Sequence, residues 1–328
     1  MADTKTSALS VFSIDAEDLL YAVDDPSSTP TSGKILSSSL MFNRYKLVVT
    51  VATNDLTVKV THPDGNNPSS ARPLYFKIGD TIRSATGTLS VTLVDGTNWM
   101  GLGSAVLAAV EQDLFAYIGY NATDGVVIGV SRVPYANQYS DFSTTSTDAD
   151  YAKISTITNA AAADPYVLVG RCAATLSAGA GYTWTVPTFT PKNLIHRPIY
   201  ATRWVDYNLV PTNGSTGNGT VVAKYRMDMY GIDFVLNLTF GSTTSVSGDY
   251  SFVLPASPSP DFQALVDFTE SGVQGLVGYG VSGAGSLFTR VVNVAGTYPT
   301  NSTALSSTVP FTWGTGDVIR VSGRYKTV

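Results

Sequence analysis

Acidic residues are the first candidates for chemistry in this sequence, because two carboxylates at the right separation hydrolyse glycosidic bonds. The chain carries 25 Asp and Glu residues, so some of them come close together in any fold. Their spacing singles out no pair, and there is no repeat of the kind that builds a parallel β-helix, the fold of many polysaccharide-degrading enzymes. The candidates are Asp113, Asp141, Asp228, Asp233, Asp261, Asp267 and Glu270. We predict no catalytic residues and no enzymatic activity.

Histidine and cysteine are scarce, with two His and one Cys in the chain. Nucleophilic catalysis needs a histidine held beside a Ser or Cys. His62 precedes Pro63 in a predicted turn, and His196 lies in a proline-spaced stretch, so neither has the setting of a fixed base. So few ligands also argue against a zinc site, and we predict no metal. Cys172 is expected to be a small buried apolar residue.

A glycine motif at Gly278, Gly280 and Gly283 has the G-x-G-x-x-G spacing of a dinucleotide-binding loop. That motif binds a pyrophosphate only where a helix follows and points its N-terminus at the phosphates. Here the next residues, "AGSLFTRVV", have the pattern of another strand. We predict that these glycines allow a turn or a close approach of two strands, and that no cofactor binds.

Aromatic residues are the remaining candidates for binding, with 18 Tyr, 13 Phe and 4 Trp in the chain. Aromatic rings pack at subunit interfaces and stack on sugars. Two polar segments carry such rings: "NQYSDFS", with Tyr139 and Phe142, and "YNLVPTNGSTGNG", with Tyr207. We take these three residues as candidate glycan contacts. The alternative is that both segments are plain solvated loops.

Composition favours a folded protein rich in β-structure. Charged residues make up 14% of the chain and hydrophobic residues 44%, and Gly, Ser and Thr are abundant, as is common in all-β proteins. The net charge is -5 and no dense run of Lys or Arg occurs, so nucleic acid is not an expected partner. No stretch reaches the roughly 20 apolar residues of a membrane span, and the N-terminus lacks a signal-peptide pattern.

Strand patterns follow one another from Tyr45 onward, about ten residues apart. Asp-Gly pairs at 64–65, 95–96 and 124–125 mark tight turns between them, since such turns need a residue that tolerates a positive φ. Regular spacing of this kind is typical of a sandwich or barrel. The one plausible helix, which is equally an irregular connection, ends at Pro165. We predict an all-β protein of tandem, jelly-roll-like β-sandwich modules.

The composition changes along the chain and divides it into three predicted segments. Residues 1–40 contain one apolar cluster and a Pro/Ser/Thr linker, too little to form a core alone. They either add a strand to the neighbouring domain or form an arm that docks on another protein. Residues 41–195 form a central β-rich domain, and residues 196–328 form a C-terminal sandwich. The final segment alternates Ile319 and Val321 with Arg320 and Ser322, which predicts that the last strand is a structural member of the sheet.

These features resemble a known class of proteins. The C-terminal third is similar to a β-sandwich domain at the ends of tail-fibre and minor-tail proteins of tailed bacteriophages. The middle third is similar to segments of the same virion proteins, in "GTNWMGLGSAVLAAVEQDLFAYIGYNATDGVVIGVSRVPYA" and "ADPYVLVGRCAATLSAGAGYTWTVP". The C-terminal positions that carry the resemblance are Trp204, Gly219, Arg226, Gly231, Gly241, Gly248, Phe252, Leu254, Pro255, Trp313, Gly316, Asp317, Gly323 and Tyr325.

The N-terminus resembles the leader by which phage fibres or spikes attach to the particle. The similarity lies in "MADTKTSAL" and "DLLYAVDDP", and it makes Leu9, Leu19, Leu20, Tyr21 and Val23 the expected virion-attachment residues. The resemblance implies a homotrimer in the virion, assembled in the host cytoplasm and bound to another virion protein through this arm. The C-terminal domain would face outward and bind a host-surface polysaccharide. A capsid fibre or decoration protein without receptor binding is the alternative, and a polysaccharide depolymerase is a third possibility.

Overall fold

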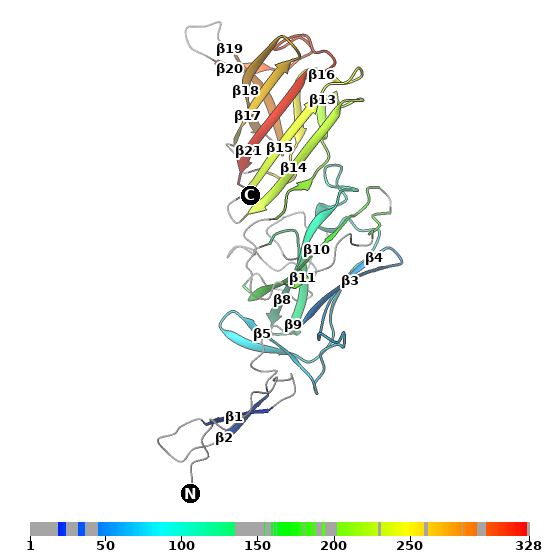
Figure 1. Cartoon of the computed structure of the whole chain (residues 1–328), viewed down its shortest axis with the longest axis vertical. Helices are drawn as coiled ribbons and strands as arrows, with labels where there is room; N and C mark the ends of the chain where they lie inside the picture. The colour runs from blue at the N-terminus through cyan, green and yellow to red at the C-terminus, as the bar shows by residue number, and fades with distance from the viewer. Residues whose placement is uncertain are drawn as a thin grey trace.

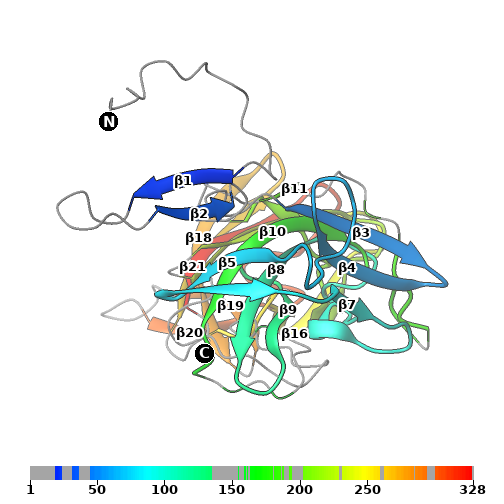
Figure 2. The ribbon, with the colours of Figure 1, turned by 90° about the horizontal axis from the view of Figure 1, so that it is seen from below.

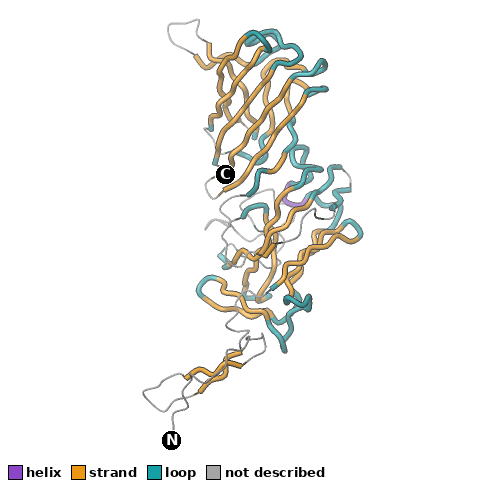
Figure 3. The backbone as a smooth tube through the Cα atoms, viewed as in Figure 1, coloured by secondary structure: helices purple, strands orange, loops and turns teal. Residues whose placement is uncertain are grey.

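The structure is a computed structural model of the 328-residue chain. It describes residues 19–23, 32–36, 45–134, 154, 159, 161, 163–179, 181–185, 187, 192–193, 202–228, 231–258, 262–283, 285–293 and 300–326. Almost all regular structure in these ranges is β-strand, as the orange segments in Figure 3 show. One 3-10 turn, η2 (Trp99–Gly101), is the exception. The predicted all-β fold class is confirmed at this level.

In Figure 1 the N-terminal hairpin lies at one end of the long axis, the following strands up to β11 (Lys192–Asn193) lie in the middle, and the C-terminal sheet lies at the other end. Two short strands, β1 (Leu19–Val23) and β2 (Ser32–Leu36), pair with each other in a sheet of their own. In Figure 1 this hairpin lies at the N-terminal end of the molecule, apart from the other strands, and Figure 2 shows it from that end. The expected attachment residues Leu19, Leu20, Tyr21 and Val23 belong to β1, whereas Leu9 lies outside the described residues.

The middle of the molecule contains three small antiparallel sheets. β3 (Lys46–Ala52), β4 (Asp55–Thr61) and β7 (Leu89–Leu93) form the first, in the order β3-β4-β7. β5 (Leu74–Ile78) and β6 (Thr81–Ala85) form a hairpin. The third has the order β11-β10-β8-β9 and contains β8 (Gln112–Asn121), β9 (Gly125–Ser131), β10 (Tyr166–Ala174) and β11 (Lys192–Asn193).

Strand β8 is the centre of this middle region, because it is buried along nearly its whole length. Leu114, Ala116 and Ile118 face the main hydrophobic core, while Phe115 and Tyr117 pack with Ile154 in a smaller cluster on the other face. A strand that is covered on both faces has apolar residues at consecutive positions, which explains the run "LFAYIG".

The predicted Asp-Gly turns are present at all three places. Gly65, Gly96 and Gly125 have φ values of +91°, +72° and +75°, in a region of backbone conformation that residues other than Gly rarely adopt. Gly125 opens β9 directly after the turn from β8. In the stretch that ends at Pro165, Ile154 forms a single β-bridge, and the Asp164 amide donates to the Ala161 carbonyl at 3.0 Å. Most of the predicted helix lies outside the described residues.

The C-terminal region is one ten-stranded antiparallel sheet that curls on itself (Figure 1). The strand order is β12-β14-β15-β21-β17-β18-β19-β16-β13, with β20 paired to β19. Its strands are β12 (Val205–Asp206), β13 (Pro211–Ser215), β14 (Thr220–Asp228), β15 (Gly231–Thr239), β16 (Ser245–Val253), β17 (Gln263–Glu270), β18 (Gln274–Gly283), β19 (Ser286–Asn293), β20 (Thr300–Ala304) and β21 (Val318–Tyr325).

The last strand, β21, lies in the interior of this sheet, hydrogen-bonded to β15 on one side and β17 on the other. Ile319 and Val321 are buried, while Arg320 and Ser322 are exposed, so the predicted alternation is confirmed. Both edges of β21 are therefore covered within the chain. The threefold packing expected from the resemblance is not needed to cover this strand.

Aromatic rings fill the inside of the curled sheet. Trp313 stacks on Phe240 with a centroid separation of 4.6 Å and meets Phe268 edge-on at 6.2 Å. The indole N–H of Trp313 donates to the Ser306 carbonyl at 3.0 Å, so its one polar atom is satisfied where it is partly buried. The segment from Leu305 to Asp317 thus closes the core on the way into β21.

Polar contacts join the middle region to the C-terminal sheet. The Tyr225 hydroxyl on β14 donates to the side-chain oxygen of Gln112 on β8, and the Gln112 amide donates to the Asp206 carbonyl at 3.0 Å. Arg132 is buried and donates to the hydroxyl of Tyr225 at 3.4 Å and to the carbonyl of Pro255 at 3.5 Å. These contacts place the C-terminal sheet directly against β8.

A buried carboxylate strengthens this junction. The side chain of Asp113, on β8, is only 2% exposed. It accepts hydrogen bonds from Arg171 on β10 at 2.7 Å and from Arg203 at 2.8 Å, and Arg203 also pairs with Glu111. A buried carboxylate is tolerated only where such partners replace its lost hydration. Asp113 therefore ties β8 both to its neighbouring strand and to the segment that leads into the C-terminal sheet.

Cys172 is buried on β10, as predicted, and it gives a test of native packing. Burial raises the pKa of its thiol to about 12, with a smaller contribution from the nearby Asp113 charge. Because the thiolate is the reactive form, we expect native protein to resist Ellman's reagent at pH 8 and unfolded protein to react fully. Absorbance at 412 nm over a denaturant series measures this directly. Rapid labelling of the native protein would contradict the packing of β10.

Candidate functional site

The most distinctive surface is the outer face of the curled sheet. In an antiparallel sheet, directly paired residues lie on the same face, and every second residue of a strand returns to that face. Pairing across four strands sets Val222, Asn237, Arg320 and Asp267 in one row. The next row contains Val235, Ser322 and Leu265. These seven residues come from β14, β15, β21 and β17.

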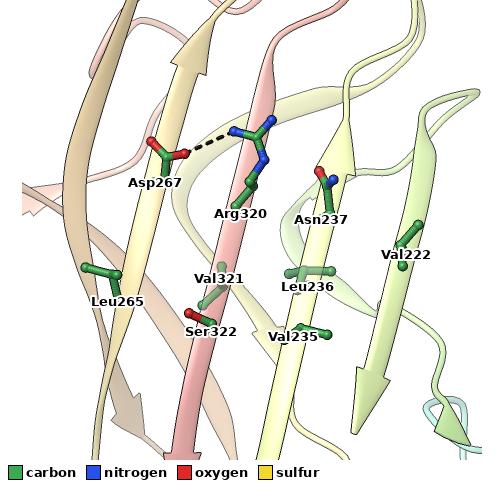
Figure 4. Close-up of a pocket in the computed structure, with 9 residues that line it drawn as sticks. All are labelled: Val222, Val235, Leu236, Asn237, Leu265, Asp267, Arg320, Val321 and Ser322. Atoms are coloured by element: carbon green, nitrogen blue, oxygen red, sulfur yellow. Dashed lines mark hydrogen bonds and ion pairs between the residues drawn. The ribbon is translucent and has the colours of Figure 1, made fainter. Parts of the chain in front are cut away.

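A pocket of about 350 Å³ opens between these two rows (Figure 4). Its walls are mainly apolar: Val222, Val235 and Leu265 are large apolar side chains that remain exposed. Pockets of this size are typical of small-ligand sites. The pocket is lined by Val222, Val235, Leu236, Asn237, Leu265, Asp267, Arg320, Val321 and Ser322.

The polar groups of the pocket are centred on one ion pair. Arg320 donates from one terminal nitrogen to Asp267 at 3.0 Å and to the hydroxyl of Thr269 at 3.1 Å. Both charged side chains stay about half exposed, so they remain accessible from solvent. The amide oxygen of Asn237 is buried and accepts no hydrogen bond among the described residues, a situation that costs about 1–3 kcal/mol. The pocket therefore offers both donors and acceptors with no net formal charge.

The other acidic candidates are held by partners within the chain. Asp228 and Asp233 both accept hydrogen bonds from Arg324, and Asp233 also pairs with Arg226. Glu270 accepts from Gln274 at 2.8 Å, and Asp113 forms the junction described above. Asp141 and Asp261 lie outside the described residues. Asp228 and Asp233 thus share Arg324 as a partner, and among the described candidates Asp267 is the one that lines the pocket between β14 and β17.

The remaining sequence motifs have structural roles. The His62 ring is buried and its Nε2 lies 3.0 Å from the Arg72 carbonyl, whereas His196 falls outside the described residues. The glycine motif lies on β18 and is followed by β19, so it lacks the helix that a dinucleotide site requires. A Cβ on Gly278 would come within 2.3 Å of the Arg290 carbonyl oxygen, which confirms the predicted close approach of two strands.

The predicted glycan contacts are not found at this surface. Tyr139 and Phe142 lie outside the described residues. Tyr207 is only 4% exposed, because its ring packs edge-on against Tyr225 at 6.1 Å inside the junction. Its side chain is thus unavailable to a surface ligand, and the prediction for this residue is wrong.

The pocket residues were not predicted because they lie on the outward face of strands, whereas the predicted binding groups lie in polar segments with aromatic residues. A signal was present. In "FVLNL", Val235 is two residues from both Asp233 and Asn237, and alternate residues of a strand share a face. Its apolar side chain must therefore lie on the exposed face with these polar residues. An apolar residue at an outward position is the feature that deserves a functional explanation.

No family model matches the chain, and no curated protein matches its sequence. Within the described ranges, no cluster of three or more His, Cys, Asp or Glu residues is placed to hold a metal ion. The same part of the chain contains no helix that is long and apolar enough to cross a membrane.

Proposed function

We propose that the protein is a non-enzymatic appendage of a tailed-phage virion, a short fibre or spike. Residues 1–40 attach it to another virion protein, and the C-terminal sheet binds the host surface. In this proposal the curled sheet is a jelly-roll-like module and the appendage is a homotrimer. The observation that carries the proposal is the linear arrangement in Figure 1, where a separate N-terminal hairpin and a large sheet occupy opposite ends. The pocket lies on that large sheet.

Two features of the described residues support this assignment. The polar junction around Gln112 and Asp113 joins the C-terminal sheet to the middle region, which suits an appendage that holds this sheet at a fixed distance from its attached end. The exposed apolar residues on the sheet face give that end a surface suited to recognition. The sequence resemblance to phage fibres points the same way.

The proposal is tested with the purified full-length protein. We expect a solution mass near three times 34.6 kDa by light scattering, and binding of labelled protein to cells of some strains in a bacterial panel. A trimer that binds no strain and no purified surface polysaccharide would favour a decoration protein. Release of reducing ends from such polysaccharides would establish a depolymerase instead. A monomer that binds no cells would overturn the proposal.

A further inference from the structure

We propose that the pocket between Val222 and Leu265 on the outer face of the C-terminal sheet binds a neutral sugar ring. This inference rests on the proposed host-surface function and names the site and the ligand class. It differs from the loop contacts expected from sequence, because every lining residue lies on a strand. Strands of a paired sheet hold side chains more firmly than loops do, which suits a binding site.

The charge of the pocket selects a neutral ligand. Arg320 and Asp267 form an ion pair at 3.0 Å with no net charge. An anionic ligand would be repelled by the Asp267 carboxylate, and a cationic ligand would be repelled by the Arg320 guanidinium. A hydroxyl group both donates and accepts. Adjacent hydroxyls on one ring can therefore donate to Asp267 and accept from Arg320 without breaking the ion pair. The hydrogen bonds to Asp267 and Thr269 use one terminal nitrogen of Arg320, and its other nitrogens make no hydrogen bond within the described part of the chain.

The walls of the pocket suit the C–H faces of a sugar. Val222, Val235 and Leu265 are exposed apolar side chains on both sides of the polar row. A bound ring would remove apolar surface from water on these residues while its hydroxyls stay near the polar groups. Asn237, Arg320 and Asp267 belong to three neighbouring strands, which lie about 4.8 Å apart. The polar row therefore extends about 10 Å, enough for one ring and its substituents.

The sheet provides a matched pair of variants for testing this site. Leu265 lines the pocket and is 61% exposed, whereas Val277 lies on the neighbouring strand of the same face, is 63% exposed and does not line the pocket. Val277 and Asp267 are directly paired, so the control position is one strand away from the ion pair. Leu265→Ala and Val277→Ala thus remove similar exposed apolar groups inside and outside the proposed site.

The experiment uses ligand-observed NMR on the full chain, with methyl glycosides of neutral hexoses and N-acetylhexosamines as probes. N-acetylneuraminic acid and glucuronic acid serve as charged comparators. We expect a neutral glycoside to bind, Leu265→Ala to weaken it about fivefold and Arg320→Gln about tenfold. Val277→Ala should leave the affinity unchanged. Circular dichroism verifies that each variant folds, as expected for exposed positions.

Each other outcome decides against the site. Glycoside binding that is indifferent to Leu265→Ala and Arg320→Gln would overturn it while leaving the proposed host-surface function intact. Preference for the acidic sugars would overturn the neutral ligand class. A lower solution mass of the Leu265→Ala variant would assign this face to a second copy of the chain. If no sugar binds, the inference fails, and a parallel cell-binding assay tests the proposed function separately. Binding to cells would support the proposed host-surface function, and absence of binding would contradict it.

Discussion

Deletion of residues 318–328 is expected to prevent the ten-stranded sheet from folding. The deletion removes β21, which is hydrogen-bonded on both edges, and leaves β15 and β17 facing an empty position in the middle of the sheet. It also removes the buried side chains of Ile319, Val321 and Tyr325 from the core. Each of these contributes about 1.5–3 kcal/mol, and a domain has a total stability of only about 5–15 kcal/mol.

The measurement is near-ultraviolet circular dichroism combined with limited proteolysis of the full chain and the truncated chain. The truncated protein should lose the aromatic signal of the C-terminal core and be cleaved throughout residues 202–317. A matched control removes only residues 326–328, which follow β21. This shorter deletion should leave both signals unchanged. Protection of the C-terminal strands in the longer deletion would contradict the central position of β21.

Asp113→Asn is expected to destabilise the protein by about 3 kcal/mol. The substitution keeps the volume of the side chain, but removes the charge that faces Arg171 and Arg203 and turns an N–H group toward one of them. Breaking a buried ion pair costs about 3–5 kcal/mol, and the lower figure applies because both arginines keep some contact with solvent. Denaturant unfolding followed by tryptophan fluorescence measures the change in the free energy of unfolding.

Asp206→Asn is the control for this substitution. Asp206 pairs with Lys224 at 2.9 Å, but its side chain is 61% exposed. Exposed pairs of this kind contribute about 0–1 kcal/mol, so the control should change the stability little. Equal effects of the two substitutions would show that the Asp113 contacts do not hold the junction together.

Local features of the fold could be predicted from sequence, since they depend on residues close together in the chain. The alternation of Ile319 and Val321 with Arg320 and Ser322 determines which face of β21 is buried. The Asp-Gly pairs determine where tight turns occur, because Gly accepts a positive φ. The buried position of Cys172 follows from its apolar surroundings in the sequence.

The strand order could not be predicted in the same way. β21 pairs with β15 and β17, which are separated from it by many residues, and period-2 patterns do not specify a partner. For the same reason the pocket was not foreseen, since it exists only where Val222, Arg320 and Leu265 from separate strands meet. Tyr207 was misjudged because a polar sequence around it indicated a loop, while contacts with β14 place its ring inside.

The strands at the two ends of the C-terminal sheet, β12 and β13, affect how copies of the chain can associate. β12 contains only two residues, and β13 begins with Pro211 and has a register irregularity between Thr212 and Gly214. Short strands, proline and bulges at a margin make poor templates for adding a further strand from another molecule. Continuous growth of the sheet from chain to chain through β12 and β13 is therefore disfavoured at high local concentration.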